Sequence, residues 1–442
     1  MGVLVMIGQV LLGLSILIVL HEFGHFLAAR AFGIKVEKFY LFFDAWGIKL
    51  FKFKYKECEY GIGWLPLGGY VKIAGMIDES MDTEQLKGEP QPWEFRSKPA
   101  WQRLIVMLGG IIVNIILGIV IFWMLTFKHG ETYVDNTKLV SGIAPGIIGE
   151  KIGLQAGDRI TEIDGQPVLR FDELLSSKVL MGNTTLTVQR GGETLKITVP
   201  GDILNDVADY DRNEFVGLRS RTMAVDTVFA GSAAEKSGIR PGDSILAVNG
   251  RSAPFWDQVR GTVSANAGKT VELLLLRNND SLTVQADVPQ DGMLGFGIRT
   301  DMDFPYVTTH YGFFESLPIG ASKAWGSLIA NAQGLGKIAK GELRVDKAIS
   351  GPVGIATMFG SEVNWLKFWS LVGLLSMALA LMNLLPIPAL DGGHVVFLLI
   401  EMIQGKPLSE KFLEKAQIAG FFILLALMIF VFGNDIMKIV NK

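Results

Sequence analysis

Charge is distributed so unevenly along this chain that the distribution decides what the chain can fold into. Four runs of 19 to 24 residues carry no Asp, Glu, Lys or Arg: Met1–Leu20, Leu104–Phe127, Phe368–Leu390 and Ala416–Asn434. A helix rises about 1.5 Å per residue, so about 20 apolar residues cross the hydrocarbon core of a bilayer. We therefore predict four transmembrane helices, with the lipid bilayer as a permanent partner.

The remaining residues exclude several classes of protein. Lys plus Arg is 41 and Asp plus Glu is 44, which gives a net charge of −3 and no basic footprint for nucleic acid. The single cysteine, Cys58, excludes an internal disulfide framework and an all-cysteine metal site. No Lys or Arg precedes Arg30, so the first run lacks the basic start of a secretory signal peptide, and we expect it to remain as a membrane helix.

Basic residues gather between the first two runs, whereas none precedes the first run and only Lys128 and Lys138 follow the second closely. Arg30 and Lys35 follow the first run, and Arg96 and Arg103 precede the second. Because basic residues favour the cytoplasmic side of a membrane, we predict that loop 32–100 is cytoplasmic. Four spans then place both termini and the long segment between the second and third runs on the opposite side.

That long segment contains an internal repeat. Residues 146–165 and 231–250 align at a constant offset of 85, and eight of the twenty positions are identical. A period of this length indicates two tandem small domains rather than a solenoid. Alternating residues after each copy predict a hairpin. The predicted strands are 184–188 and 195–199 in the first copy, and 271–276 and 281–288 in the second.

The first helix carries a metal-binding motif. His21-Glu22-Phe23-Gly24-His25 has the H-E-x-x-H pattern, in which residues i and i+4 share one helix face and can bind one metal ion. Glu22 is placed to reach a water molecule on that metal. The helix stays apolar beyond the motif, and ionisable residues within a membrane helix are costly and usually functional. The alternative interpretation is a polar cluster that only ties helices together.

Two histidines need a third protein ligand to complete a catalytic zinc site. The candidates are Asp391 and His394, which follow Asn383 at the end of the third uncharged run. Pro386 and Pro388 lie between Asn383 and Asp391 and remove backbone donors, so the helix must break or kink there. A broken helix can turn either side chain toward a metal on the first helix.

Two family resemblances follow from these motifs. The repeated pattern Gly-Leu/Ile-x-x-Gly-Asp-x-Ile, followed by Asp-Gly or Asn-Gly, resembles PDZ domains, which bind extended peptides; spacer domains without a ligand are the alternative. His21–His25, Asn383–Gly393 and the repeats together resemble the site-2 protease family of intramembrane zinc metalloproteases over nearly the whole chain. Gly68-Gly69-Tyr70-Val71-Lys72 is similar to that family's membrane-associated strand.

This second resemblance implies a function and its residues. His21, His25 and Asp391 would bind one Zn²⁺ per chain, Glu22 would be the catalytic base and Asn383 would contact substrate. The substrates would be single-span membrane proteins, such as a pre-trimmed anti-sigma factor in an envelope stress response, and remnant signal peptides. The location would be the bacterial inner membrane, with both termini and the PDZ pair periplasmic and the active site near the cytoplasmic side.

A substrate helix hides its carbonyl groups in its own hydrogen bonds, so the enzyme must unwind it and supply new partners. We predict that the strand edge formed by Gly68, Gly69, Tyr70 and Val71 pairs with the unwound substrate. Asn383 would hold another backbone group. The alternative is that Gly68-Gly69 is only a turn.

We therefore predict a polytopic α-helical membrane protein with four transmembrane helices, a membrane-associated β-hairpin or sheet, and two tandem PDZ domains between the second and third spans. Its segments are expected as follows: spans 1–31, 101–127, 367–391 (broken at proline) and 416–438; cytoplasmic loops 32–100 and 392–415; PDZ domains 128–220 and 221–309; and an amphipathic periplasmic linker 310–366.

Two other functions remain open on the sequence. A non-catalytic membrane scaffold would bind exposed C-termini through its PDZ domains and would need no metal. A metal transporter would use His21, His25 and Asp391 as transport ligands, but four spans without an evident inverted repeat argue against it.

Overall fold

The computed structural model describes residues 2–66, 68–76, 88–210, 214–221, 224–298, 304–345 and 351–440. Parts of the predicted segments 32–100, 128–220, 221–309 and 310–366 lie outside these ranges. The chain divides into two compact units, one formed by Met1–Gly130 with His310–Lys442 and the other by Glu131–Thr309.

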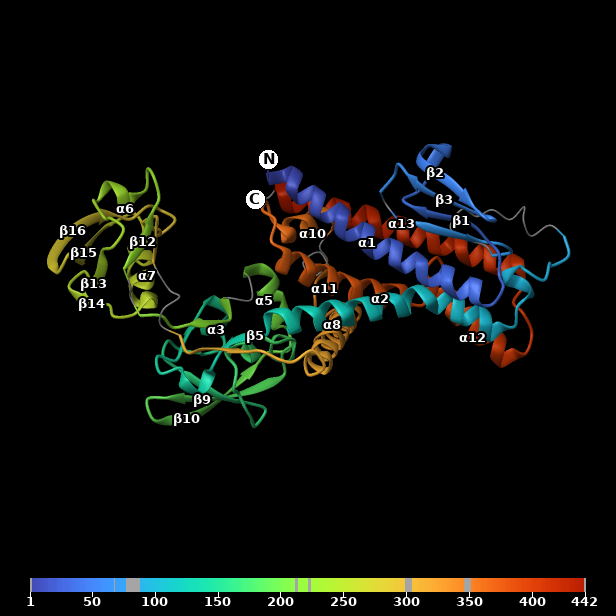
Figure 1. Cartoon of the computed structure of the whole chain (residues 1–442). Helices are drawn as coiled ribbons and strands as arrows, with labels where there is room; N and C mark the ends of the chain where they lie inside the picture. The colour runs from blue at the N-terminus through green and yellow to red at the C-terminus, as the bar shows by residue number, and fades with distance from the viewer. Residues whose placement is uncertain are drawn as a thin grey trace. The chain divides into compact units, whose positions relative to one another are not determined.

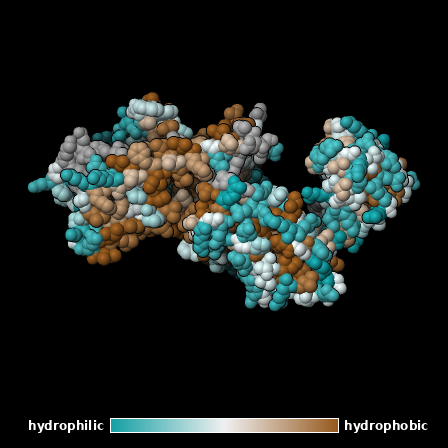
Figure 2. Space-filling model, turned by 180° about the vertical axis from the view of Figure 1, so that it is seen from behind, coloured by the Kyte–Doolittle hydropathy of each residue, from teal (hydrophilic) through white to brown (hydrophobic). Residues whose placement is uncertain are grey.

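The first unit is a bundle of long apolar helices (Figure 1). Within the described residues, four helices are long and apolar enough to cross a membrane. They are α1 (Gly2–Ala31), α2 (Ala100–His129), α11 (Trp365–Leu384) and α13 (Glu410–Val440). Figure 2 shows hydrophobic residues gathered on the surface of this unit, as expected for helices that face lipid. The four predicted helices are confirmed.

The third predicted span differs from the structure at its end. The helix α11 stops at Leu384, where Pro386 and Pro388 follow, and a new helix α12 (Asp391–Gln404) begins at Asp391. The stretch 392–415, which we expected to be a loop, is therefore helical over 392–404 and again from 410, where α13 begins. Apolar residues such as Val395 and Leu398 are buried along α12, and Gly405 ends it with a φ of 71°.

Glycines set the close crossing of α1 and α2. The Cβ of an alanine at Gly109 would lie 2.6 Å from the Gly24 carbonyl oxygen, so the two backbones are in direct contact. Gly24 lies inside the H-E-x-x-H motif. The motif is therefore pressed against the middle of α2.

The predicted linker 310–366 is largely helical. It contains α8 (Ser316–Ala339) and α10 (Pro352–Phe359). The helix α8 packs on α2 through Gly320, whose added Cβ would lie 2.5 Å from Trp123 Cα. Asp435 of α13 is buried and accepts hydrogen bonds from the backbone N–H groups of Gly351 and Val353, at the start of α10.

Loop 32–100 forms a four-stranded sheet with the order β2-β3-β1-β4. Its strands are β1 (Val36–Leu41), β2 (Lys49–Tyr55), β3 (Cys58–Gly63) and β4 (Tyr70–Ile73). The strands β1 and β4 are antiparallel, with Tyr40 opposite Tyr70. Among the described strands, β4 pairs with β1 and ends the order of the sheet.

The second unit contains the two repeats, and they share one topology (Figure 1). The sheet order β10-β9-β7-β8 in the first copy matches β16-β15-β13-β14 in the second. A separate two-stranded sheet, β6 with β11 or β12 with β17, accompanies each. Both predicted hairpins are confirmed. The strands are β6 (Ile143–Pro145), β7 (Arg159–Ile163), β8 (Gln166–Pro167), β9 (Thr184–Arg190), β10 (Glu193–Val199), β11 (Val216–Leu218), β12 (Val225–Val228), β13 (Ser244–Val248), β14 (Arg251–Ser252), β15 (Thr270–Arg277), β16 (Asp280–Asp287) and β17 (Phe296–Ile298).

Short helices and one more strand pair complete this unit. The helices are α3 (Ile147–Lys151), α4 (Ser177–Leu180), α5 (Ile203–Tyr210), α6 (Ala233–Lys236) and α7 (Trp256–Ser264), and β5 (Glu131–Val134) pairs with β18 (Tyr306–Thr309).

The repeated Gly-Asp step has a structural reason. Asp243 is 1% exposed, and the Arg277 guanidinium donates to both its carboxylate oxygens at 2.7 and 2.8 Å. In the first copy Arg190 donates to both oxygens of Asp158 at 2.7 Å. Each arginine comes from the hairpin and closes the same bidentate pair. The aspartate thus occupies the same position in both repeats, and its arginine partner comes from the equivalent hairpin in each copy.

We expect Asp243→Asn to destabilise the second repeat by about 2 kcal/mol, because hydrogen bonds to charged groups contribute about 1.5–3 kcal/mol. Amide hydrogen exchange in β15 and β16 of the full-length protein in detergent should become about 30-fold faster. Asp280→Asn, at the exposed start of β16, is the control and should leave exchange unchanged. Equal exchange in the two variants would contradict the assigned role.

The same pair gives a pH dependence. Burial raises the pKa of Asp243, but the Arg277 guanidinium and the Arg240 backbone N–H outweigh burial and hold the pKa below its usual value. Its stabilising effect is therefore present above the unfolded pKa of about 3.9 and is lost as the pH falls through the folded pKa. The difference between wild type and Asp243→Asn should shrink below about pH 4.

Candidate metal centre

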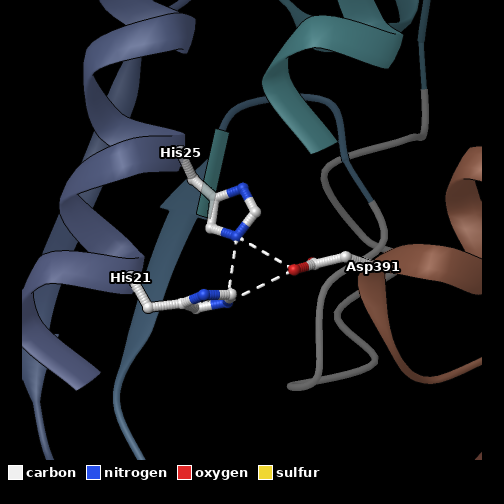
Figure 3. A group of neighbouring side chains, drawn as sticks. All are labelled: His21, His25 and Asp391. Carbon is white, nitrogen blue, oxygen red and sulfur yellow. Dashed lines mark hydrogen bonds and ion pairs between the residues drawn. The ribbon is translucent and has the colours of Figure 1, made fainter. Parts of the chain in front are cut away.

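Three side chains from two distant parts of the chain meet beside α2. His21 and His25 lie one turn apart on α1, and Asp391 is the first residue of α12 (Figure 3). Asp391 Oδ2 lies 3.2 Å from His21 Nε2 and 3.3 Å from His25 Nε2, and the two Nε2 atoms are 3.3 Å apart. The three ligand atoms form an almost equilateral triangle.

This triangle has the dimensions of a zinc site. Ligands about 2.0–2.1 Å from a tetrahedral ion lie about 3.3–3.4 Å apart. Asp391 Oδ2 is also a buried oxygen with no hydrogen-bond donor among the described residues, as expected for an atom reserved for a metal. Two imidazoles and one carboxylate are a donor set that suits zinc and leaves a fourth position open. The residues present therefore fit a zinc ion.

His394 does not belong to the triangle. Among the described residues, the atoms that gather within 4.8 Å of one another come from His21, His25 and Asp391. His394 lies on α12 one turn further along and hydrogen-bonds Gln417 of α13. Of the two alternatives for a third ligand, the fold brings Asp391 to the histidines.

The helix α2 fixes both imidazole rings. His25 Nδ1 lies 2.8 Å from the Val106 carbonyl and donates to it, which leaves the Nε2 lone pair for a metal. The side-chain amide of Asn114, fully buried, lies 3.1 Å from His21 Nδ1. Between them, Gly110 has no side chain, and a Cβ there would lie 2.7 Å from His21 Nδ1. The rings fill the space that Gly110 leaves.

These α2 residues were not identified from the sequence. The available signals were the adjacent glycines Gly109 and Gly110 and the single polar Asn114 within an uncharged run. The sequence also did not reveal an ion pair between Arg103 of α2 and Glu401 of α12, each side chain 13% exposed. This pair holds α12 against α2 near the end of α12, whereas Asp391 lies at its start.

Glu22 lies at a cavity next to the triangle. The cavity has a volume of about 730 Å³, and both Glu22 and Asn383 line it. The backbone N–H of Val71 donates to the Glu22 carboxylate, and the Asn383 side-chain nitrogen lies 3.1 Å from His21 Nε2. The Glu22 carboxylate, the Asn383 amide and the three ligand side chains therefore line the same cavity.

The predicted substrate edge borders the same cavity. Gly68, Gly69, Tyr70 and Val71 all line it, at and just before the start of β4. Gly69 passes so close to α1 that an added Cβ would lie 2.6 Å from Ile18 Cγ2 and 3.4 Å from Glu22 Cγ. Glycine is needed there for this approach. All nine predicted site residues therefore lie around one cavity.

Comparison with known proteins agrees with this geometry. The profile described as Peptidase family M50 matches residues 9–427. The Regulator of sigma E protease of Haemophilus influenzae is 30% identical, covering 98% of this chain and 99% of that protein. The Regulator of sigma-E protease RseP of Escherichia coli is 31% identical, covering 97% and 98%. The "Putative zinc metalloprotease" of Neisseria meningitidis is 28% identical, covering 96% and 97%.

Proposed function

The chain belongs to peptidase family M50, the site-2 proteases, and is a membrane-embedded metalloprotease; from this premise we propose that it cuts peptide bonds inside the transmembrane segments of single-span proteins. The observation that carries the proposal is the triangle of His21, His25 and Asp391 beside a cavity that holds a carboxylate. We propose a pre-trimmed anti-sigma factor and remnant signal peptides as substrates, because two relatives are named regulators of sigma E.

Each residue of the centre has a proposed role. His21, His25 and Asp391 hold one Zn²⁺, which when bound lowers the pKa of a water molecule and polarises the scissile carbonyl. Glu22 accepts the proton of the attacking water on its carboxylate and then delivers it to the leaving amine nitrogen. Val106 and Asn114 keep the imidazoles oriented, and Asn383 holds a backbone group of the substrate.

Metal removal tests this function directly. Purified full-length protein should contain one zinc per chain and should cut a single-span reporter in detergent. Dialysis against a chelator should abolish cleavage, because the triangle then lacks its electrophile, and one equivalent of Zn²⁺ should restore it. A protein without stoichiometric zinc that still binds C-terminal peptides would indicate the scaffold function instead. Cleavage that persists after the metal has left would contradict the metalloprotease mechanism.

We propose that the unwound substrate joins β4 as an added strand. The support is the extended conformation of β4, its place in a sheet with β1, and its position on the cavity. A strand in this position presents its carbonyl groups to backbone donors and so loses less hydrogen bonding than a free unwound helix.

Disulfide cross-linking distinguishes strand pairing from helical docking. In a Cys58→Ser, Glu22→Gln background, Tyr70→Cys should cross-link to cysteines scanned along the reporter with a period of two, since alternate residues of a strand share one face. Lys54→Cys, on the opposite edge strand β2, is the matched control and should give no cross-link. A period of three to four residues would mean that the substrate remains helical at β4.

We propose that the two repeats are PDZ domains on the periplasmic side that act as a size filter, with both termini on the same side and the active site near the cytoplasmic face. The supports are the shared topology of the two copies and the basic residues of loop 32–100. Such a filter admits a trimmed substrate and excludes an intact one.

A further inference from the structure

The outer strand of the sheet carries an unusual exposed surface. It consists of the apolar residues Trp46, Ile48, Leu50, Phe51, Phe53 and Tyr55 and the lysines Lys52, Lys54 and Lys56, which we call the Trp46–Lys56 surface. Trp46 is 85% exposed, and its φ of 55° lies in the left-handed region, which is costly for a bulky residue. Its ring stacks on Trp64 with centroids 5.5 Å apart, and most of its surface still faces outward.

The two faces of β2 differ in chemistry. Side chains alternate along a strand, so Phe51, Phe53 and Tyr55 share one face of β2 and Lys52 and Lys54 lie on the other, while Lys56 follows the strand. Phe53 stacks on Tyr60 with ring centroids 5.2 Å apart, and Tyr60 lies 6.2 Å from Phe26 of the membrane helix α1. The aromatic face of the sheet is thus continuous with a helix that faces lipid.

On the neighbouring strand β3, Glu59 stands opposite Lys54 in register. Lys49 pairs with Glu59 at 2.6 Å, which uses that carboxylate. No acidic side chain among the described residues forms an ion pair with Lys52, Lys54 or Lys56, and all three are exposed. Positive charge therefore remains on the face opposite the aromatic rings.

We propose that the Trp46–Lys56 surface binds anionic phospholipids of the bilayer that α1 and α2 cross. The strand lies at the depth of the lipid glycerol groups, where its aromatic rings reach the acyl boundary and its lysines extend to phosphate oxygens. Residues 32–99 join the end of α1 to the start of α2, so the sheet lies at the membrane face where these helices end. The content of anionic lipid in that leaflet then determines how tightly β2 binds to the membrane surface.

Fluorescence of a label on β2 tests this inference. Full-length protein carrying Phe53→Cys in a Cys58→Ser background is labelled with a polarity-sensitive dye and reconstituted in nanodiscs. Discs of phosphatidylcholine alone are compared with discs containing one-third phosphatidylglycerol. We expect a blue shift in the anionic discs that weakens at high salt, because salt screens exposed charges.

Charge variants separate lipid binding from simple burial. Removal of one lysine should lower the affinity of the surface for anionic lipid about fivefold, so Lys52→Gln, Lys54→Gln and Lys56→Gln together should lower it about 100-fold. The three Lys→Arg changes should retain the shift. Lys196→Gln, Lys236→Gln and Lys269→Gln together, outside this sheet, are the matched control and should also retain it. A dye signal that is equal in both kinds of disc, or a Lys→Arg protein that behaves like the Lys→Gln protein, would overturn the proposal.

Discussion

Glu22→Gln should lower reporter cleavage about 100- to 10,000-fold while the protein keeps its zinc. The amide has nearly the shape of the carboxylate, so the cavity and the Val71 contact are largely preserved, but it cannot accept the proton of an attacking water. The ligand triangle does not include Glu22, so metal content should stay at the wild-type level. The measurement is reporter cleavage together with zinc per chain.

The matched variant for this result is Asp391→Asn. It removes a triangle oxygen and should lose both cleavage and tight zinc binding, whereas Glu22→Gln should lose cleavage alone. If Glu22→Gln retained cleavage, the proton would have to pass through another group on the cavity. If both variants lost zinc, Glu22 would be a ligand and the proposed division of roles would be wrong.

Gly110→Ala should weaken zinc binding about 100-fold, although Gly110 is not itself one of the proposed metal ligands. The added Cβ would lie 2.5 Å from His21 Cε1 and 2.7 Å from His21 Nδ1. The rings cannot retreat without breaking the His25 contact with Val106 or the His21 contact with Asn114. Competition with a chromogenic chelator measures the loss.

Gly8→Ala is the control for this change. Gly8 lies on α1, and an added Cβ there meets no atom within 4 Å. Alanine also favours a helix over glycine by about 1 kcal/mol. Zinc affinity should therefore stay unchanged in Gly8→Ala. Normal zinc affinity in Gly110→Ala would show that α2 can shift away from α1 to accommodate the added methyl group. The proposed role of α2 in orienting the imidazole rings would then be wrong.

The elements with strong periodic or compositional signals were predictable from the sequence. Uncharged runs predict the long helices because hydrocarbon tolerates few other structures. Alternation with turn residues predicts the hairpins of both repeats. The motif His21–His25 predicts a shared helix face from spacing alone. Each of these signals is local, so no knowledge of the remaining chain is required.

The features that escaped prediction depend on contacts between distant segments. Nothing near Gly110 in the sequence says that two imidazoles will fill its missing side chain, because the histidines lie on another helix. Residues 392–415 give no long uncharged run and were expected as a loop, yet a new helix begins at Asp391, whose carboxylate suits the positive N-terminal end of α12. The choice of Asp391 over His394 as the third ligand came from the family resemblance. The close approach of the three ligand atoms became visible only in the fold.

The separation of the triangle in sequence has a consequence for how the protein is made. His21 and His25 leave the ribosome well before Asp391, which follows only after the second unit and α11 have been synthesised. A growing chain therefore holds two imidazoles without their carboxylate for most of its synthesis. Under the proposed chemistry, the inserted α1 and α2 cannot hydrolyse a peptide bond until Asp391 has also entered the membrane.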